Sequence, residues 1–149
     1  MGDVYNIDIT SANAELVLAA EEVFPAGIAL QMFSTDQSYS AEAQTMTETR
    51  MGVDGHIAAG YVPSEKVVTI TLEAASPSYP FLAELATAME TNRKVYRCTL
   101  LATLPAIGRT LIWSVGVLYS GTRVPAGAKT LQPTTWTFHF EQFAETEII

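Results

Sequence analysis

The chain has 149 residues, of which 48% are hydrophobic and 16% are charged, so it is long and apolar enough for one domain with a hydrophobic core. Its 16 acidic and 8 basic residues give a net charge of −8, and the basic residues form no cluster beyond Arg93, Lys94 and Arg97. This balance argues against a nucleic-acid binder that is held by phosphate contacts, because each such contact needs a lysine or an arginine. The single cysteine, Cys98, excludes an intrachain disulfide.

The start of the chain, MGDVYNIDIT, lacks the basic residues and the apolar stretch of a signal peptide. No later run approaches the roughly 18 consecutive apolar residues that a membrane span requires. We therefore expect a protein that is made in a cytoplasm and has no membrane partner. The abundance of threonine, valine, isoleucine and aromatic residues favours strands along most of the chain.

Three short strands are predicted in the first part of the chain, at residues 4–10, 14–20 and 27–34. Residues 11–13 form the expected turn between the first two. The third strand follows Pro25, and its mixed faces predict burial on one side and a partner on the other.

A long hairpin is predicted next, over about residues 43–62. Polar and apolar residues alternate from Thr45 to the pair Asp54-Gly55, and a second run leaves that pair at once, which is typical of two strands joined by a tight turn. The two strands carry few side chains that could fill a core. We therefore expect the hairpin to have a role other than packing in the core of the domain.

A strand over residues 66–75 follows the hairpin. One of its faces holds Val68, Ile70 and Leu72, and the other holds Val67, Thr69, Thr71 and Glu73. Such alternation predicts an antiparallel sheet with one buried face and one face in water.

Residues 76–92 break the strand pattern and predict one amphipathic helix of about three turns, over about residues 78–91. Ser78 is expected to cap the first turn and Asn92 to end the helix. Pro80 is tolerated in the first turn, because its missing amide hydrogen would have no partner there. The face expected to pack on the sheet follows three- and four-residue spacing and consists of Phe81, Leu82, Leu85 and Met89.

Three longer strands complete the chain, at residues 94–104, 109–121 and 134–143. In the last strand, three aromatic residues alternate with polar ones: Trp136, Phe138 and Phe140 with Thr135, Thr137, His139 and Glu141. Each buried ring contributes roughly 2 kcal/mol or more, so the aromatic side should face the core. The expected fold is mainly β (α+β), an antiparallel β-sandwich or open barrel with one flanking helix and a long extended hairpin, in a single domain of residues 1–149.

The sequence shows no enzymatic signature. His56 and His139 lie far apart without metal-ligand spacing, so both are expected at the surface or in ordinary hydrogen bonds. Cys98 lies in an apolar run, where a buried thiol is more typical than a nucleophile. The glycines within residues 52–55 lack the lysine and the helix of a phosphate-binding loop. We expect no catalytic residue, no metal and no cofactor.

Two longer strings, VTITLEAASPSYPFLAEL and RCTLLATLPAIGRTLIWSVGVLYSG, and the Trp-Thr-Phe strand that follows them resemble the tail-tube family of bacteriophages with contractile tails. The resemblance covers roughly residues 28–143 and rests on the order of elements and on a few local strings. It implies a small β-sandwich or open barrel with a helix on its flank. In that family six copies form a ring whose inner strands join into one barrel around a channel, and rings stack into a tube. The implied location is the tail of the virion, with assembly in the cytoplasm of the bacterial host.

The resemblance also assigns roles to residues. The hairpin becomes an arm between subunits, through Thr45, Met46, Glu48, Arg50, Met51, Asp54, Gly55 and Ile57. The polar faces of two strands would line the channel, through Thr69, Thr71, Glu73, Thr135, Thr137 and Glu141. The implied partners are further copies of the chain, a tail sheath, a tape-measure protein and a baseplate. DNA would pass without specific binding, because an acidic wall repels phosphates.

Other interpretations remain open at this point. A ring of the same fold could belong to a baseplate or to an initiator of the tube. A β-rich ligand-binding module outside viruses would need a concave apolar pocket with a few converging polar groups. A small hydrolase would need an acid, a base and a nucleophile that come together only after folding.

Overall fold

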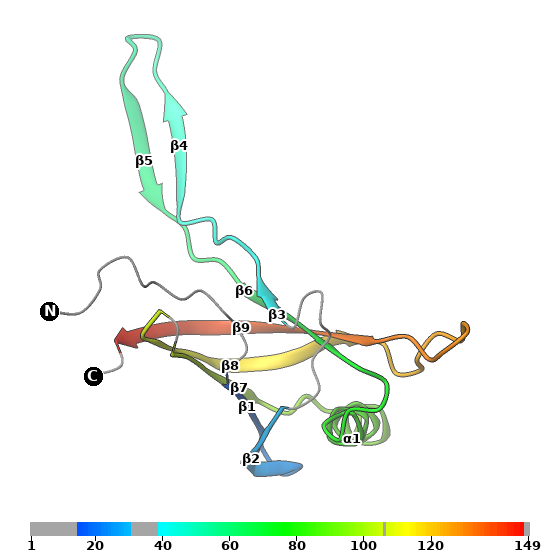
Figure 1. The fold of residues 1–149 in the computed structure, drawn as a ribbon. Coiled ribbons are helices and arrows are strands. Elements are labelled where there is room, and N and C mark those ends of the chain that lie inside the picture. Colours follow the sequence, from blue (N-terminus) through cyan, green and yellow to red (C-terminus); the bar gives the residue numbers. More distant parts are fainter. Residues whose placement is uncertain (1–14, 31–38, 106, 148–149) are drawn as a thin grey trace, which may run out of the picture.

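The computed structural model describes residues 15–30, 39–105 and 107–147. Nine strands and one helix lie in these ranges (Figure 1). In chain order they are β1 (Glu15–Ala20), β2 (Phe24–Ala29), β3 (Tyr39–Ala41), β4 (Thr47–Met51), β5 (Ile57–Tyr61), β6 (Lys66–Leu72), α1 (Tyr79–Asn92), β7 (Cys98–Leu104), β8 (Arg109–Gly121) and β9 (Thr134–Glu147). The strand expected at residues 4–10 and the end of the strand expected at residues 27–34 lie outside the described residues.

Seven of the strands form one antiparallel sheet in the order β2-β1-β7-β8-β9-β6-β3, whereas β4 and β5 form a separate two-stranded sheet. The two edges of the larger sheet, β2 and β3, do not pair with each other, so the sheet is not closed into a barrel. Helix α1 lies beside this sheet, and the β4–β5 pair stands away from both (Figure 1). The expected fold class is confirmed as a mainly antiparallel β protein with an open sheet and one helix.

The core lies on one face of the seven-stranded sheet. In the register of β6 and β9, Val68 lies opposite Phe138 and Ile70 opposite Trp136, and these four side chains are fully buried together with Phe140. Leucines from the neighbouring elements complete the buried cluster: Leu16, Leu18, Leu72, Leu82, Leu85 and Leu100. Each such side chain contributes about 1.5–3 kcal/mol relative to exposure in water, so this face holds most of the stabilisation of the fold.

Strand β8 changes the phase of its alternation at Val115, whose φ is +55°. Trp113 and Gly116 therefore both face the core although they are three residues apart. The pairing with β7 shifts at the same place, between Cys98 and Leu100. An irregularity of this kind adds one residue to a strand and turns the following side chains to the other face.

Helix α1 buries a narrower face than its sequence predicts. Leu82 and Leu85 are fully buried. Phe81 is 40% exposed, and its ring packs edge-on against Phe24 with 6.1 Å between centroids. Met89 is partly buried against the core. Two leucines one turn apart thus hold the helix on the sheet, while Phe81 and Met89 lie at the margins of the contact.

The start of α1 also differs from the expectation. Ser78 occupies the N-cap position, but its side chain makes no capping hydrogen bond, because its backbone already has helical angles (φ −83°, ψ −19°). Its hydroxyl donates to the carbonyl oxygen of Ala29 at 3.4 Å, and the Ser76 hydroxyl accepts the Ser78 amide at 3.1 Å. Pro80 lies in the first turn. The helix ends at Asn92, as expected, and the C-cap residue Arg93 lies in the left-handed region, with φ 49°.

Several strand boundaries differ from the predicted ones. Strand β6 ends at Leu72 and not at residue 75, and β7 begins at Cys98 and not at residue 94. Strand β2 begins at Phe24 and runs through Pro25, which an edge strand tolerates because one of its sides has no hydrogen-bonded strand. Strand β9 continues beyond the predicted end at Phe143, because the first half of β8 supplies backbone partners as far as the pair of Arg109 and Glu147. The aromatic alternation stops before the backbone pairing does.

Candidate assembly surfaces

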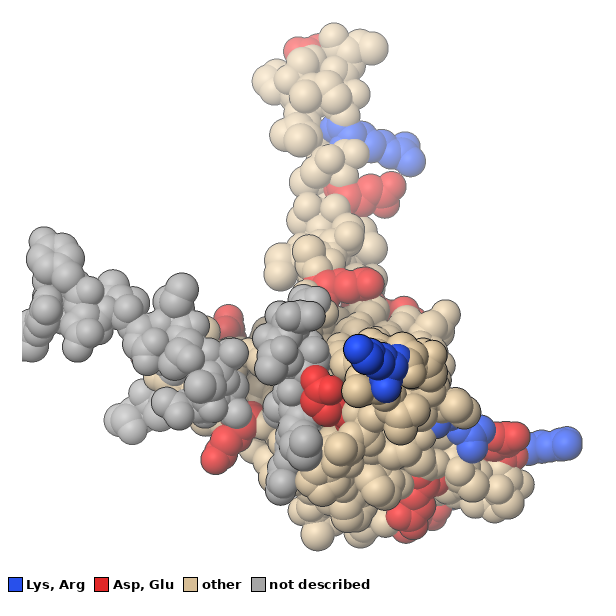
Figure 2. Space-filling model, turned by 45° about the vertical axis from the view of Figure 1, so that its right-hand side comes forward, with Lys and Arg blue, Asp and Glu red and all other residues tan. Residues whose placement is uncertain are grey.

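Strands β4 and β5 form a narrow arm, residues 45–62, that projects from the sheet (Figure 2). Their pairing runs from Thr47 opposite Tyr61 to Met51 opposite Ile57. Every residue from 45 to 61 is exposed. Nothing in the described chain covers them, so the arm adds almost no apolar burial to the fold of one subunit.

A three-residue loop, residues 53–55, closes the arm. The Gly52 amide donates to the carbonyl oxygen of His56 at 2.8 Å, and the Gly55 amide donates to that of Gly52 at 3.0 Å. Gly55 lies in the left-handed region, with φ 84°, where a residue without Cβ is not strained. The expected tight turn at Asp54-Gly55 is confirmed, and these residues are the second and third of its three-residue loop.

The two faces of the arm differ in chemistry. Residues opposite each other in an antiparallel pair share a face, so Met51, Ile57 and Tyr61 lie on one side, which we call the apolar face of the arm. These three side chains are between 63% and 77% exposed. Glu48 and Arg50 lie on the opposite side. Large exposed apolar side chains grouped on one surface are typical of an interaction site.

The residues assigned to the arm from sequence occupy three parts of it. Thr45 and Met46 lie at its foot, Glu48, Arg50, Met51 and Ile57 on its strands, and Asp54 and Gly55 in its loop. Sequence reasoning missed two exposed apolar residues, Val53 at the tip and Tyr61 on the apolar face. Tyr61 follows from the alternation once the register of the hairpin is fixed.

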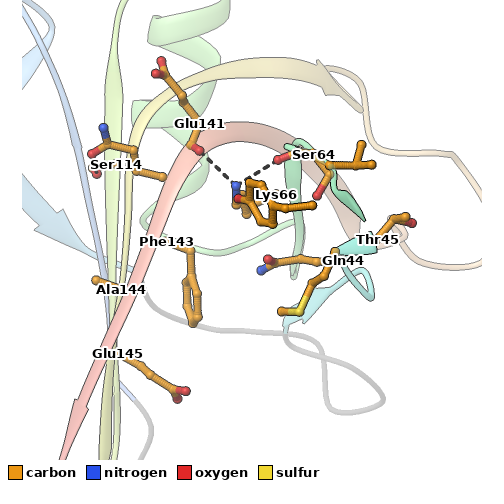
Figure 3. Close-up of a pocket in the computed structure, with 13 residues that line it drawn as sticks. Gln44, Thr45, Ser64, Lys66, Ser114, Glu141, Phe143, Ala144 and Glu145 are labelled. Carbon is orange, nitrogen blue, oxygen red and sulfur yellow. Dashed lines mark hydrogen bonds between the residues drawn. The ribbon is translucent and has the colours of Figure 1, made fainter. Parts of the chain in front are cut away.

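A hollow of about 730 Å³ lies between the foot of the arm and β9 (Figure 3). Its lining comes from the arm foot, from Lys66 in β6, from Ser114 in β8 and from residues 141–145 in β9. The Lys66 ammonium donates to the carbonyl oxygens of Ser64 at 2.9 Å and Glu141 at 3.2 Å. Lys66 thus ties the chain that leaves the arm to β9.

A second contact fixes the foot of the arm. The Glu65 carboxylate lies 2.9 Å from Nδ1 of His139, a residue of β9. The His139 ring stacks on Tyr119 of β8, with 3.9 Å between centroids. Two consecutive residues, Glu65 and Lys66, therefore hold the base of an arm that is otherwise in solvent.

The candidate channel-lining residues lie on the face of the β6–β9 pair that is opposite the core. Four of them form one patch: Thr69, Thr71, Thr135 and Thr137. The hydroxyls of Thr69 and Thr137 are 3.5 Å apart. Glu73 follows the end of β6 beside this patch, whereas Glu141 lies at the other end of the pair, so the structure does not bring the two carboxylates together.

The cysteine and histidine side chains of the described residues are candidates for a nucleophile or for metal ligands. Burial raises the pKa of the Cys98 thiol to about 12, and Sγ lies 3.5 Å from the carbonyl oxygen of Tyr96, so the thiolate nucleophile is disfavoured. His56 directly follows the arm loop, and its amide donates to the Asp54 carboxylate at 3.2 Å. No group of three histidine, cysteine or acidic side chains within the described ranges could hold a metal ion.

The same ranges contain no helix with the length and apolarity that crossing a membrane demands.

Comparison with known proteins gives a matching family and solved structures of similar fold. Residues 7–144 match the family described as tail fiber protein gp32. No curated protein matches the chain. A chain in the extended sheath-tube complex of a PVC extracellular contractile injection system has a TM-score of 0.62 and 14% identity, with 97% of this chain and 94% of that chain covered.

Two further solved structures share the fold. The sheath/tube terminator of the PVC system gives a TM-score of 0.61 at 13% identity, covering 95% of this chain and 99% of that chain. A chain of the anti-feeding prophage baseplate, in a six-fold symmetrised structure, gives 0.58 at 12% identity, covering 99% of both. At such low identity these matches show a shared fold.

Proposed function

The chain belongs to the tail fiber protein gp32 family, and from this premise we propose that it forms six-membered rings that stack into the inner tube of a contractile tail. It is a structural tail protein with a tube-like fold, and not an enzyme. The description of the family refers to a fiber, whereas the fold is shared with chains of a sheath-tube complex, a terminator and a baseplate. Our proposal rests on this shared fold and not on the word fiber in the family description.

The arm is the observation that carries the proposal. Its apolar face exposes Met51, Ile57 and Tyr61 and has no partner among the described residues of its own chain. A neighbouring copy would cover this face if each arm lies on the next subunit. Such a head-to-tail contact uses two different surfaces and closes into a ring when its rotation allows it.

The open sheet also supports a ring. Its edge strands β2 and β3 are not paired with each other, and unpaired edges accept strands from other chains. Sheets of successive subunits, placed edge to edge, would form one large barrel around a channel. The threonine patch with Glu73 and Glu141 would then face the channel.

Passage of DNA follows from the same arrangement. Each chain has a net charge of −8, so a channel lined by these subunits repels phosphates and offers no cluster of cations to hold them. The tube would lie in the tail of the virion, after assembly in the host cytoplasm. Its partners would be a sheath outside, a tape-measure protein inside and a baseplate at one end.

A second candidate is a ring at the end of the tube or within a baseplate, including one that initiates the tube. The observation that favours it is the fold shared with the PVC terminator and the anti-feeding prophage baseplate chain, at TM-scores of 0.61 and 0.58. A shaft protein forms stacks of many rings by itself. An end ring forms single rings that do not stack on themselves.

Paired variants of the arm test the proposal. Met51→Ser with Ile57→Ser changes the apolar face, and Glu48→Gln with Arg50→Gln changes the opposite face by the same number of residues. We expect the first pair to prevent ring formation and the second to preserve it, with equal thermal unfolding because all four side chains are exposed. Rings that form normally from a chain with residues 47–61 replaced by a short linker would contradict the proposal.

A further inference from the structure

The connection between β8 and β9, residues 122–133, is a structured loop that helix α1 holds in place. The Arg123 guanidinium pairs with the Glu90 carboxylate and donates to the Thr87 hydroxyl at 3.1 Å. The Tyr79 hydroxyl donates to the carbonyl oxygen of Arg123. Within the loop, the Gln132 amide donates to the carbonyl oxygen of residue 126 at 3.0 Å. Both the side chain and the backbone of Arg123 are therefore fixed on α1.

This loop presents an apolar and basic surface. Val124 is 78% exposed and Leu131 is 62% exposed. The loop contains no acidic residue, and Lys129 forms no ion pair with any described residue. Apolar side chains and a free cation on a fixed loop form a surface that suits a partly apolar, acidic partner.

The hollow at the foot of the arm has the complementary chemistry. Phe143 lines it from β9 and Met46 from the arm foot, and the side chains of Phe143 and Glu145 project to the same side of β9 (Figure 3). The acidic residues Glu141 and Glu145 belong to the lining. Its one cation, Lys66, already donates to two backbone carbonyls. A lysine of another chain that entered the hollow would therefore find carboxylates with which it could form ion pairs.

The loop lies at one end of the β8–β9 pair, whereas the hollow lies part-way along the pair toward the other end. Gly121 lies opposite Trp136 beside the loop, and Trp113 lies opposite Phe143 beside the hollow. From Trp113 to Gly121 the strand rises roughly 25 Å, so the loop of one chain does not reach its own hollow. Figure 1 shows the loop at one end of the sheet and the far end of β9 at the other.

We propose that the loop of residues 122–133 docks into the hollow at the arm foot of a second copy, stacked end to end with the first. Val124 and Leu131 would contact Phe143 and Met46 of that copy, and Lys129 would lie beside its Glu145. Because the two surfaces differ and lie apart along the β8–β9 pair, the contact is head-to-tail, and it repeats along one direction when its rotation does not close a ring. This inference rests on the proposed function, and it assigns the contact between successive rings.

Charge reversal tests this contact. Lys129→Glu and Glu145→Lys each place like charges together, and we expect each to reduce stacked rings at least about tenfold while single rings persist. The double variant restores opposite charges, so we expect it to stack again. Glu84→Lys, on the exposed side of α1, is the matched control and should stack like the unchanged chain. Stack lengths are counted by electron microscopy, and circular dichroism checks folding.

The outcomes separate the two proposals. An unchanged chain that forms no rings would overturn the proposed function itself. Rings that stack normally in both single variants would overturn the docking contact alone, as would a double variant that stacks no better than the singles. Loss of the rings themselves in the single variants would place these residues within a ring and overturn the contact between rings.

Discussion

Gly116 of β8 lies directly opposite Phe140 of β9, and a Cβ at position 116 would lie 2.1 Å from Cδ1 of the Phe140 ring. Gly121 has the same relationship with Trp136, at 2.2 Å from ring carbon Cε3. Two aromatic side chains of β9 thus lie over two glycines of β8. Because glycine has no Cβ, the rings can cover the backbone of β8. This contact holds β8 and β9, the two longest strands of the sheet, together at the core.

Gly116→Ala should destabilise the fold by about 1–3 kcal/mol, because the new methyl group overlaps a ring that buried neighbours hold in place. Gly60→Ala is the control, since no atom lies within 4 Å of its added Cβ. Denaturant unfolding measures both variants. Equal stability of the two would show that Phe140 moves freely and does not cover Gly116.

Leu85→Ala should lower the free energy of unfolding by about 2–5 kcal/mol, because Leu85 is fully buried between α1 and the sheet. Glu84→Ala, at the adjacent exposed position, should change it by less than about 0.5 kcal/mol. Thermal or denaturant unfolding of the single subunit gives both values. A loss below about 0.5 kcal/mol for Leu85→Ala would mean that the helix contributes little to the fold of one chain.

The arm should exchange its amide hydrogens rapidly in a free subunit and slowly in an assembly. A two-stranded hairpin in water is marginally stable by itself, and every residue from 45 to 61 is exposed. Hydrogen exchange on separated monomers and assemblies compares the two states, with the buried strand β6 as the internal reference. Strong protection of residues 45–61 in a proven monomer would contradict an arm that is ordered by its neighbours.

Glu73→Lys combined with Glu141→Lys should make assemblies retain DNA at low salt while rings still form. Glu73 and Glu141 lie at the two ends of the threonine patch. Lysines at these positions would make new phosphate contacts that weaken as the salt concentration rises. Glu84→Lys, on the helix, should not change retention. If the variant assembles normally but binds DNA no better than the unchanged chain at low salt, the threonine patch does not line the channel.

The sequence predicted the elements of the sheet better than the details that orient their side chains. Residues 109–121 coincide with β8, and the expected helix at 78–91 lies one residue from α1 at each end. The positive φ of Val115 could not be predicted, because a strand pattern with period two contains no signal for an added residue. Ser78 met the residue preference of an N-cap, but its backbone adopted helical angles that remove the capping bond.

The assembly surfaces were only partly accessible from sequence. The arm was predictable because its alternation and its glycine lie within about twenty consecutive residues. The hollow at its foot was not, because Lys66, Ser114 and Phe143 come together only through the strand order of the sheet. The shape of the loop of residues 122–133 could not be predicted from sequence, because it depends on the contacts of Arg123 with α1.

Electron cryo-microscopy of the purified, unmodified chain tests the central claim most directly. We predict six-fold rings with an open central channel, in which the apolar face of each arm, with Met51, Ile57 and Tyr61, lies on a neighbouring subunit. Monomers that persist at high concentration, or assemblies in which the arms remain in solvent, would contradict the account.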